Sequence, residues 1–116
     1  MQALLDGADH FLDKNTSGVL ATVDRQIMLL DGSLVPHKSL QVVLDRYFAT
    51  TPYRGLRARD VIKVDSMERL SSGEESAYRV YLSFEDRYQE VLPSIRSGQG
   101  VDLRYSDGRW VVFAIS

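Results

Sequence analysis

Near the end of the sequence, two runs of hydrophobic and polar residues rich in β-forming types flank Asp107-Gly108. Asp-Gly favours the positive φ angles of a type I′ turn, so the pattern predicts a β-hairpin of residues 101–106 and 109–115. A two-residue turn would place these pairs on one apolar face: Tyr105 with Trp110, Leu103 with Val112, and Val101 with Ala114. The other face would carry Asp102 and Arg104 beside Val111, Phe113 and Ile115, which stay exposed unless something covers them.

Helical spacing marks the first half of the sequence. Apolar residues recur every three or four positions in residues 2–14 and again from about Lys38 to Ala49, which predicts two amphipathic helices. Residues 50–52, Thr-Thr-Pro, should end the second of these helices. Between the two, Thr16 or Ser17 is expected to cap a further short helix.

Strand patterns occupy most of the remainder. Ile27–Leu30 is an apolar run closed by Asp31-Gly32, and the period changes to two after Gly55, which predicts strands at 27–30 and 56–64. Residues 77–84 predict a strong strand with one apolar face, made of Tyr78, Val80, Leu82 and Phe84. Residues 89–95 are weakly β and are interrupted by Pro93. We therefore expect a single α+β domain over residues 1–116, with N-terminal helices packed on a curved antiparallel sheet of about four to five strands.

Composition narrows the class of protein. The 116 residues are 44% apolar and 26% charged, which is typical of one folded domain, and the net charge of −2 favours neither nucleic acid nor an anionic membrane as a partner. No apolar run approaches the roughly 20 residues of a membrane span, and no signal-peptide pattern is present. The lack of cysteine excludes disulfides, thiolate metal sites and a cysteine nucleophile. The compartment stays open: cytoplasmic, or periplasmic if a signal peptide has been removed.

Two segments resemble small uncharacterised bacterial members of the NTF2-like (cystatin-like) superfamily. Residues 19–48, VLATVDRQIMLLDGSLVPHKSLQVVLDRYF, place a short helix, an apolar strand and a helix closing in aromatics in the same order, and YSDGRWVVFAI looks like the usual last hairpin. The resemblance implies a cone of helices on a curved sheet, and a homodimer through the outer sheet face with Val111, Phe113 and Ile115 at the interface. The superfamily holds isomerases, dehydratases and non-catalytic binding or assembly modules, so the resemblance implies a fold rather than one activity.

A pocket between the helices and the sheet is the expected ligand site. We expect Phe11, Asp31, Tyr47, Tyr81 and Trp110 to line it and to hold a small apolar ligand. Asp31 is also the candidate catalytic group, because its place after the first strand resembles the general-base aspartate of the ketosteroid isomerase branch. That branch takes an oxyanion donor from a tyrosine on the first helix, whereas residues 9–12 here read Asp-His-Phe-Leu. The alternative is that Asp31 is an ordinary turn residue before Gly32.

Residues 13–24 match the spacing of an EF-hand calcium loop. The candidate oxygen ligands are Asp13, Asn15, Ser17 and Asp24. Against such a site, Asp24 is shorter than the usual bidentate glutamate, and a strand pattern follows where a helix is required. The alternative is a simple helix–loop–helix connection. His10 and His37 have no second ligand at metal spacing, so we expect neither a metal nor a cofactor.

Arg54, Arg57 and Arg59 make one segment locally basic. On a strand, Arg57 and Arg59 would share a face that could bind an anion or an RNA backbone. The alternative is a solvated strand face paired with Asp60, Asp65 or Glu85.

The sequence therefore favours a non-catalytic binding or assembly module that forms a homodimer. A small-ligand-binding protein, or an isomerase- or dehydratase-type enzyme that uses Asp31, is the second hypothesis, and the anion or RNA binder is the third. No complete catalytic set is visible in the sequence, so it does not decide whether the protein is an enzyme.

Overall fold

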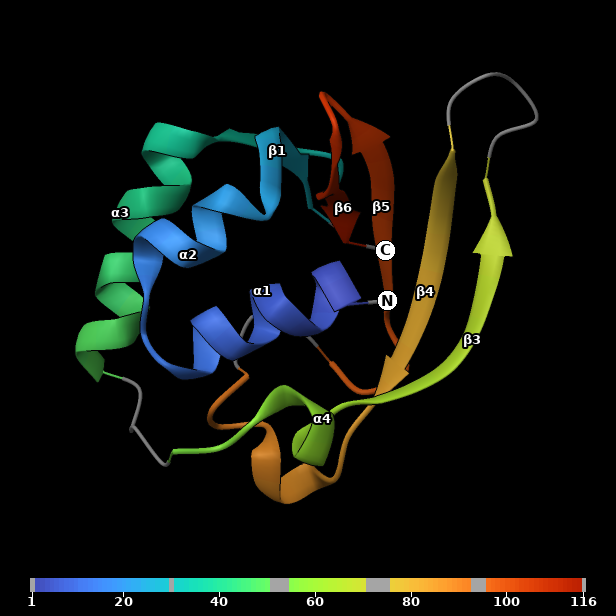
Figure 1. Cartoon of the computed structure of the whole chain (residues 1–116). Coiled ribbons are helices and arrows are strands. Elements are labelled where there is room, and N and C mark those ends of the chain that lie inside the picture. Colours follow the sequence, from blue (N-terminus) through green and yellow to red (C-terminus); the bar gives the residue numbers. More distant parts are fainter. Residues whose placement is uncertain (1, 30, 51–54, 71–75, 93–95, 116) are drawn as a thin grey trace.

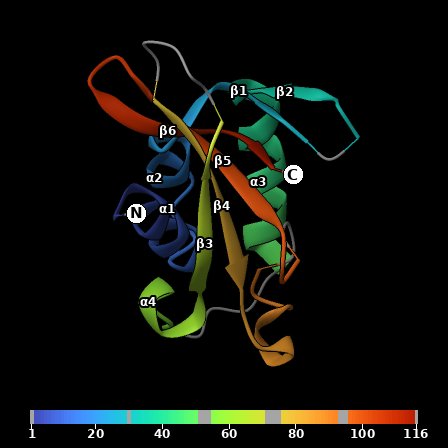
Figure 2. The same ribbon diagram turned by 90° about the vertical axis from the view of Figure 1, so that its right-hand side faces the viewer.

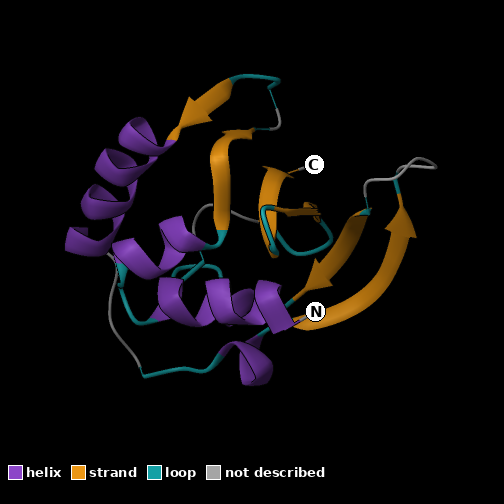
Figure 3. Cartoon of the chain, turned by 45° about the horizontal axis from the view of Figure 1, so that its top comes forward, coloured by secondary structure: helices purple, strands orange, loops and turns teal. Residues whose placement is uncertain are grey.

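Figure 1 shows the chain as a computed structural model, in which residues 2–29, 31–50, 55–70, 76–92 and 96–115 are described. In chain order the elements are α1 (Gln2–Leu12), α2 (Thr16–Ala21), β1 (Val23–Met28), β2 (Leu34–Pro36), α3 (His37–Thr50), α4 (Ala58–Val61), β3 (Lys63–Arg69), β4 (Ala77–Ser83), the 3₁₀ turn η1 (Asp86–Tyr88), β5 (Gly100–Ser106) and β6 (Arg109–Ile115). The expected α+β class is confirmed, with helices gathered on one side of a curved sheet (Figure 3). In the ranges described, no helix has both the length and the apolar character needed to cross a membrane.

The described strands form one mixed sheet in the order β2-β1-β6-β5-β4-β3. Its neighbours are antiparallel except β1 and β6, which run parallel. The expectation of an antiparallel sheet of four to five strands is therefore corrected to a mixed sheet of six. The extra strand is the short β2, which pairs with β1 through the turn at Asp31-Gly32. Figure 2 shows β3 at the edge opposite to β2.

Apolar side chains fill the space between the helices and the inner face of the sheet, the face turned toward the helices. One cluster joins α1 and α4 to β4 and β5, with Val80 and Leu103 among its buried members. A second joins α2, β1 and α3 to β6. Phe11 packs against both clusters and meets the ring of Phe48 edge-on, with ring centroids 5.2 Å apart. Helices α1 and α3 are therefore held to the sheet through a shared core.

The predicted strand at 56–64 is wrong in its first half, where the chain forms the single helical turn α4. Ala58 and Val61 are both buried, at the spacing of one helical turn. The Asp9 carboxylate on α1 accepts the Ala58 N–H at 2.7 Å, which satisfies a donor at the start of this turn. The strand begins only at Lys63, and Arg57 and Arg59 accordingly do not share a strand face.

Two other local predictions are corrected. Asn15, and not Thr16 or Ser17, caps α2, because its Oδ1 accepts the Gly18 N–H at 3.0 Å. The Thr16 hydroxyl instead donates to Asp45 on α3 at 2.7 Å. Residues 89–92 form turns instead of a strand, which lets the consecutive Val91 and Leu92 both be buried. Residues 93–95 and Leu30, also assigned to strands, lie outside the described residues.

The predicted C-terminal hairpin is confirmed, but its register changes part-way. Tyr105 pairs with Trp110 and Leu103 with Val112, as expected. A β-bulge then makes Asp102 pair with Ala114 and Val101 with Ile115. The extra residue on β6 turns Ile115 from the outer face to the inner one, where it packs with the second core cluster.

Candidate functional site

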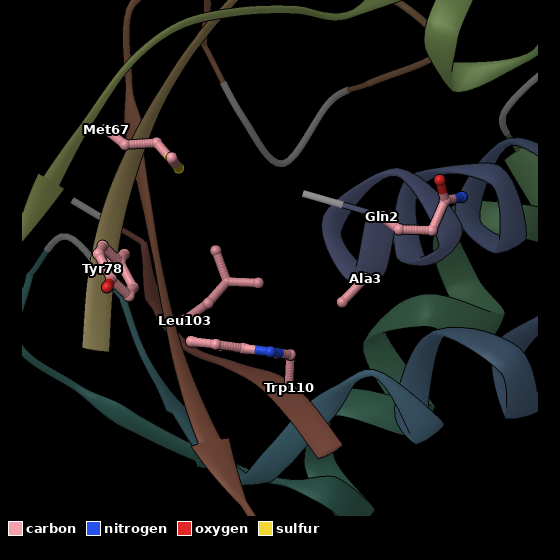
Figure 4. A pocket seen from close by; sticks show the side chains of 6 residues that line it. All are labelled: Gln2, Ala3, Met67, Tyr78, Leu103 and Trp110. Carbon is pink, nitrogen blue, oxygen red and sulfur yellow. The ribbon is translucent and has the colours of Figure 1, made fainter. Parts of the chain in front are cut away.

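A pocket of about 310 Å³ opens at the end of the inner sheet face that lies beyond the start of α1. Its described lining combines two residues of α1 with one residue from each of the strands β3 to β6: Gln2, Ala3, Met67, Tyr78, Leu103 and Trp110. In Figure 4, the Ala3 methyl and the Met67 side chain point toward the space between them, above Leu103 and Trp110. Its volume is at the small end of the range for ligand pockets.

The sheet register explains why these side chains converge. Directly opposite residues of antiparallel strands share a face, and Tyr78 lies opposite Leu103. Met67 lies opposite Val80, which belongs to the buried core, so Met67 is also on the inner face. Strands β3 and β4 extend past the described helices (Figure 1), and the first turn of α1 borders this part of the inner face through Gln2 and Ala3.

The polar atoms at the pocket belong to aromatic rings. Trp110 contacts Tyr78 and Tyr105, with ring centroids 5.9 and 5.6 Å away. Neither the Trp110 indole N–H nor the Tyr78 hydroxyl has a hydrogen-bond partner within the described ranges. Both groups are accessible, because no buried side-chain nitrogen or oxygen in those ranges lacks a partner. The Gln2 amide points away from the pocket and donates to Asp6 at 2.7 Å.

Of the five residues expected to line a pocket, Trp110 lines this one and the others lie elsewhere. Phe11 is part of the core, and Tyr47 lies half-buried on α3. Tyr81 lies on the outer face, where its hydroxyl donates to Glu68 at 3.2 Å. The lining residues Tyr78 and Leu103 were not proposed as site residues, although the alternation of β4 and β5 had placed both on the apolar face.

Asp31 does not meet the requirements of a general base. It is exposed in the turn between β1 and β2, and its Oδ1 accepts hydrogen bonds from the Ser33 hydroxyl at 2.6 Å and the Ser33 N–H at 2.9 Å. The Ser33 hydroxyl and N–H lower the pKa of this carboxyl from its ordinary value. A base in an apolar pocket needs the opposite environment. The interpretation of Asp31 as a turn residue therefore fits the geometry.

The four candidate calcium ligands are not brought together. Asp13 pairs with Arg57 at 3.3 Å, and Asn15 caps α2. Ser17 lies on α2, and Asp24 is on β1 with Arg104 as its ion-pair partner. Among the described residues no group of three or more acidic, histidine or cysteine side chains could hold a metal ion. His10 instead contacts Asn15, and His37 contacts the Val23 carbonyl.

The basic segment is also not assembled as expected. Arg57 precedes α4 and is paired with Asp13, and Arg59 lies within α4. Arg54 lies outside the described residues. Of the described arginines, Arg57 and Arg59 thus share no strand face on which they could follow a phosphate backbone.

The outer sheet face is more polar than the predicted interface. Val111 is only 2% exposed, Ile115 turns inward, and Phe113 is half-buried with the Arg104 guanidinium 5.1 Å from its ring centre. The three apolar residues therefore do not form one exposed patch.

Asp24, the ion-pair partner of Arg104, has a lowered pKa. Burial raises the pKa of this carboxyl, but the Arg25 N–H and the hydrogen bond and charge of Arg104 outweigh burial and hold the pKa below its ordinary value.

Comparison with known proteins identifies the fold. No family model and no curated protein matches the sequence. Among solved structures, a protein with a cystatin-like fold from Nostoc punctiforme aligns with a TM-score of 0.61 at 14% identity, covering 99% of this chain and 84% of that one. An NTF-2 like protein from Pseudomonas aeruginosa gives 0.50 at 19% identity, covering 94% and 86%. A designed NTF2 gives 0.52 at 13% identity, covering 99% and 90%. Identities this low establish the fold and no activity.

Proposed function

We propose that this chain, which has the NTF2-like (cystatin-like) fold, is a non-catalytic module that binds a small apolar ligand on the inner face of its sheet. The observation that carries the proposal is the pocket of about 310 Å³ beside α1, whose described lining is mostly apolar. A concave apolar site with a few accessible polar atoms is the usual form of a small-molecule site.

The chemistry of the lining supports binding over catalysis. Its described side chains include no carboxylate, imidazole or amine that could take or give a proton at neutral pH. They include Tyr78 and Trp110, whose rings offer broad apolar faces and hydrogen-bonding groups that can orient a ligand.

Trp110 provides a direct test, since it is the only tryptophan in the sequence. Titration with the neutral probe cyclohexylacetamide should change Trp110 fluorescence in a saturable way, with a Kd of about 1 mM for so small a ligand. Ala3→Phe should fill the pocket from α1 and raise the Kd at least about tenfold, which corresponds to about 1.4 kcal/mol. Ala49→Phe, at an exposed position of α3, is the matched control and should leave the Kd unchanged. A probe that does not bind, or that binds Ala3→Phe as well as the wild type, would contradict the proposal.

A homodimer through the outer sheet face is the second candidate. Met28 and Leu34 are 45% and 52% exposed and lie opposite each other on β1 and β2, on the outer face because Ile27 and Val35 face the core. Exposed apolar pairs beside a sheet are a common part of subunit contacts.

Analytical ultracentrifugation tests the dimer. The wild type should sediment as a dimer at about 100 µM, and both Leu34→Arg and Phe113→Arg should sediment as folded monomers. Val42→Arg, at an exposed position of α3, should remain dimeric. A monomeric wild type at this concentration would exclude the dimer and leave the ligand proposal intact.

A further inference from the structure

The Trp110 ring presents a flat surface to the pocket. In Figure 4 this indole is seen edge-on, so one of its faces is turned toward the space that Ala3 and Met67 border. Trp110 is half-buried and is the largest side chain of the described lining. A ligand in the pocket therefore meets a flat aromatic face as its broadest contact.

No described ring stacks in parallel on this face. Trp110 contacts Tyr78 at an interplanar angle of 51° and Tyr105 at 66°, so both neighbours meet it tilted or edge-on. Aromatic rings also pair favourably in an offset parallel arrangement. Within the described part of the chain, that arrangement on Trp110 is left for a ligand.

Met67 supplies a second surface that suits an aromatic ring. Its side chain is 55% exposed although it is apolar, and in Figure 4 its sulfur lies at the end that points toward the pocket space. A thioether sulfur makes favourable contacts with aromatic rings. A ring placed between Trp110 and Met67 would contact both side chains and would cover apolar surface that is now exposed to water.

The shape of the lining favours a flat ring over a puckered one. A flat ring can place all its atoms against the indole, whereas a saturated ring in its chair form touches a flat surface with only some of them, and dispersion attraction grows with the number of close atom pairs. The pocket volume of about 310 Å³, at the small end of the range for ligand sites, limits the ligand to a compact molecule.

We infer that the pocket takes a small aromatic compound whose ring stacks on Trp110 and contacts the Met67 thioether. This inference rests on the proposed ligand-binding function and adds to it the chemical class of the apolar body. It goes beyond apolar character, because the hydrophobic effect alone favours a saturated ring of the same size, which has more apolar surface.

Two neutral probes that differ only in the ring test the inference: phenylacetamide and cyclohexylacetamide. Isothermal titration should give phenylacetamide a Kd about twofold to fivefold below that of cyclohexylacetamide, as expected for one stacking contact. Binding driven by apolar area alone would give the opposite order.

Trp110→Leu removes the flat face and keeps an apolar side chain. Both Kd values should rise, and the preference for phenylacetamide should disappear, because only the aromatic probe loses a stacking partner. Phe113→Leu is the matched control, since it makes the same kind of change on the same strand but on the outer face, beside Arg104. This variant should keep the preference.

Proton NMR of the wild type gives a second measurement that needs no variant. Protons that lie over an aromatic face are shifted upfield, so the ring protons of bound phenylacetamide should move upfield. Nuclear Overhauser contacts should join them to the methyl groups of Met67 and Ala3, which border the same space.

The outcomes separate this inference from the function on which it rests. If neither amide binds, the proposed function fails and the inference fails with it. If cyclohexylacetamide binds as tightly as phenylacetamide or more tightly, the ligand site stands and the aromatic inference is overturned. A preference that survives in Trp110→Leu, or ring protons that do not move upfield, would overturn it as well.

Discussion

Arg79 on β4 and Asp102 on β5 lie directly opposite each other and form a two-point ion pair on the outer face of the sheet. Arg79 Nε lies 2.8 Å from Asp102 Oδ1, and its terminal Nη2 lies 3.0 Å from Oδ2. The Asp102 side chain is 5% exposed and that of Arg79 is 31% exposed. The hydrogen bond to Asp102 raises the pKa of Arg79 above its ordinary value. The two hydrogen bonds from the guanidinium fork thus help to offset the cost of burying the Asp102 carboxylate within the sheet.

Removal of the Asp102 charge should therefore destabilise the fold. Asp102→Asn leaves Arg79 with a weaker partner, and we expect the free energy of unfolding to fall by about 2–3 kcal/mol, less than for a fully buried pair because Arg79 is partly solvated. Arg79→Lys, which keeps the charge but loses the fork, should cost less. Urea denaturation followed by circular dichroism measures both. Wild-type stability in Asp102→Asn would show that the pair contributes nothing.

Gly100 lets the Arg79 side chain lie across β5. A Cβ at position 100 would stand 2.9 Å from Arg79 Cγ and 3.0 Å from Cδ, so Gly100→Ala must displace the arginine from Asp102. We expect a loss of about 1–2 kcal/mol in unfolding free energy. In an Arg79→Ala background the same substitution should cost less than about 0.5 kcal/mol, because its obstacle is gone. Equal costs in the two backgrounds would refute this account.

Gly18→Ala in α2 should not give the increase in stability that a glycine-to-alanine change in a helix usually gives. Its added Cβ would overlap the His10 ring, and so Gly18→Ala should destabilise the protein although alanine is the better helix former. In a His10→Ala background the cost should fall, although the close contact of the added Cβ with Asn15 Nδ2, at 2.7 Å, remains. Thermal unfolding of the four proteins in this cycle gives the coupling. An equal cost in the two backgrounds would show that the His10 ring is not the obstacle.

Asp9 should act as a tertiary cap for α4. Ala58 is fully buried, and in Asp9→Ala its N–H loses the carboxylate that accepts it, at an expected cost of about 1–2 kcal/mol. Asp9→Asn keeps an acceptor oxygen and should cost less than half as much. Hydrogen exchange at the Ala58 amide provides a local reading: Asp9→Ala should accelerate it, and Asp9→Asn should not. Slow exchange in both variants would point to another acceptor.

Asp24 should make stability depend on pH in acid. Its pKa is lower in the folded chain than its ordinary value, so the stabilisation by Arg104 is fully present above the unfolded pKa of about 3.9 and is lost as the pH falls through the folded value. The difference in unfolding free energy between wild type and Asp24→Asn should be constant from about pH 5 to 7 and should shrink below about pH 4. Denaturation curves across this range measure it, and a difference that persists to pH 3 would contradict the assignment.

Local turn chemistry made the hairpin predictable, and long-range packing made part of it unpredictable. Asp107-Gly108 determines the first pairs, Tyr105 with Trp110 and Leu103 with Val112. The bulge that follows lets Ile115 pack with the second core cluster. The pattern of residues along β6 does not predict this bulge. The predicted strand at 56–64 was wrong in its first half for the same reason, because the Asp9 carboxylate that caps α4 comes from far away in the sequence.

The site was predictable only in part. Trp110 was expected at a pocket because it belongs to the apolar face of the hairpin, and the same parity rule pointed to Tyr78 and Leu103. That rule argues against Tyr81, which has the opposite parity to Tyr78 on β4 and lies on the outer face. The gap beside α1 depends on where the helix begins relative to the sheet, a relation that residue patterns do not encode. The expectation that Asp31 is a general base had the weakest support in the sequence, because an Asp-Gly pair is common in ordinary turns.

The parallel pairing of β1 with β6 has a consequence for how the nascent chain folds. Val23 lies beside Val112, and Val19, Leu44 and Phe48 bury their side chains in the cluster that Val112 and Ile115 help to complete. The N-terminal elements can bring Val19, Leu44 and Phe48 together on their own, but this half of the core is covered completely only when β6 has been made and has paired with β1. Pairing of the first strand with the last is a contact of long sequence separation, which is expected to form late in folding.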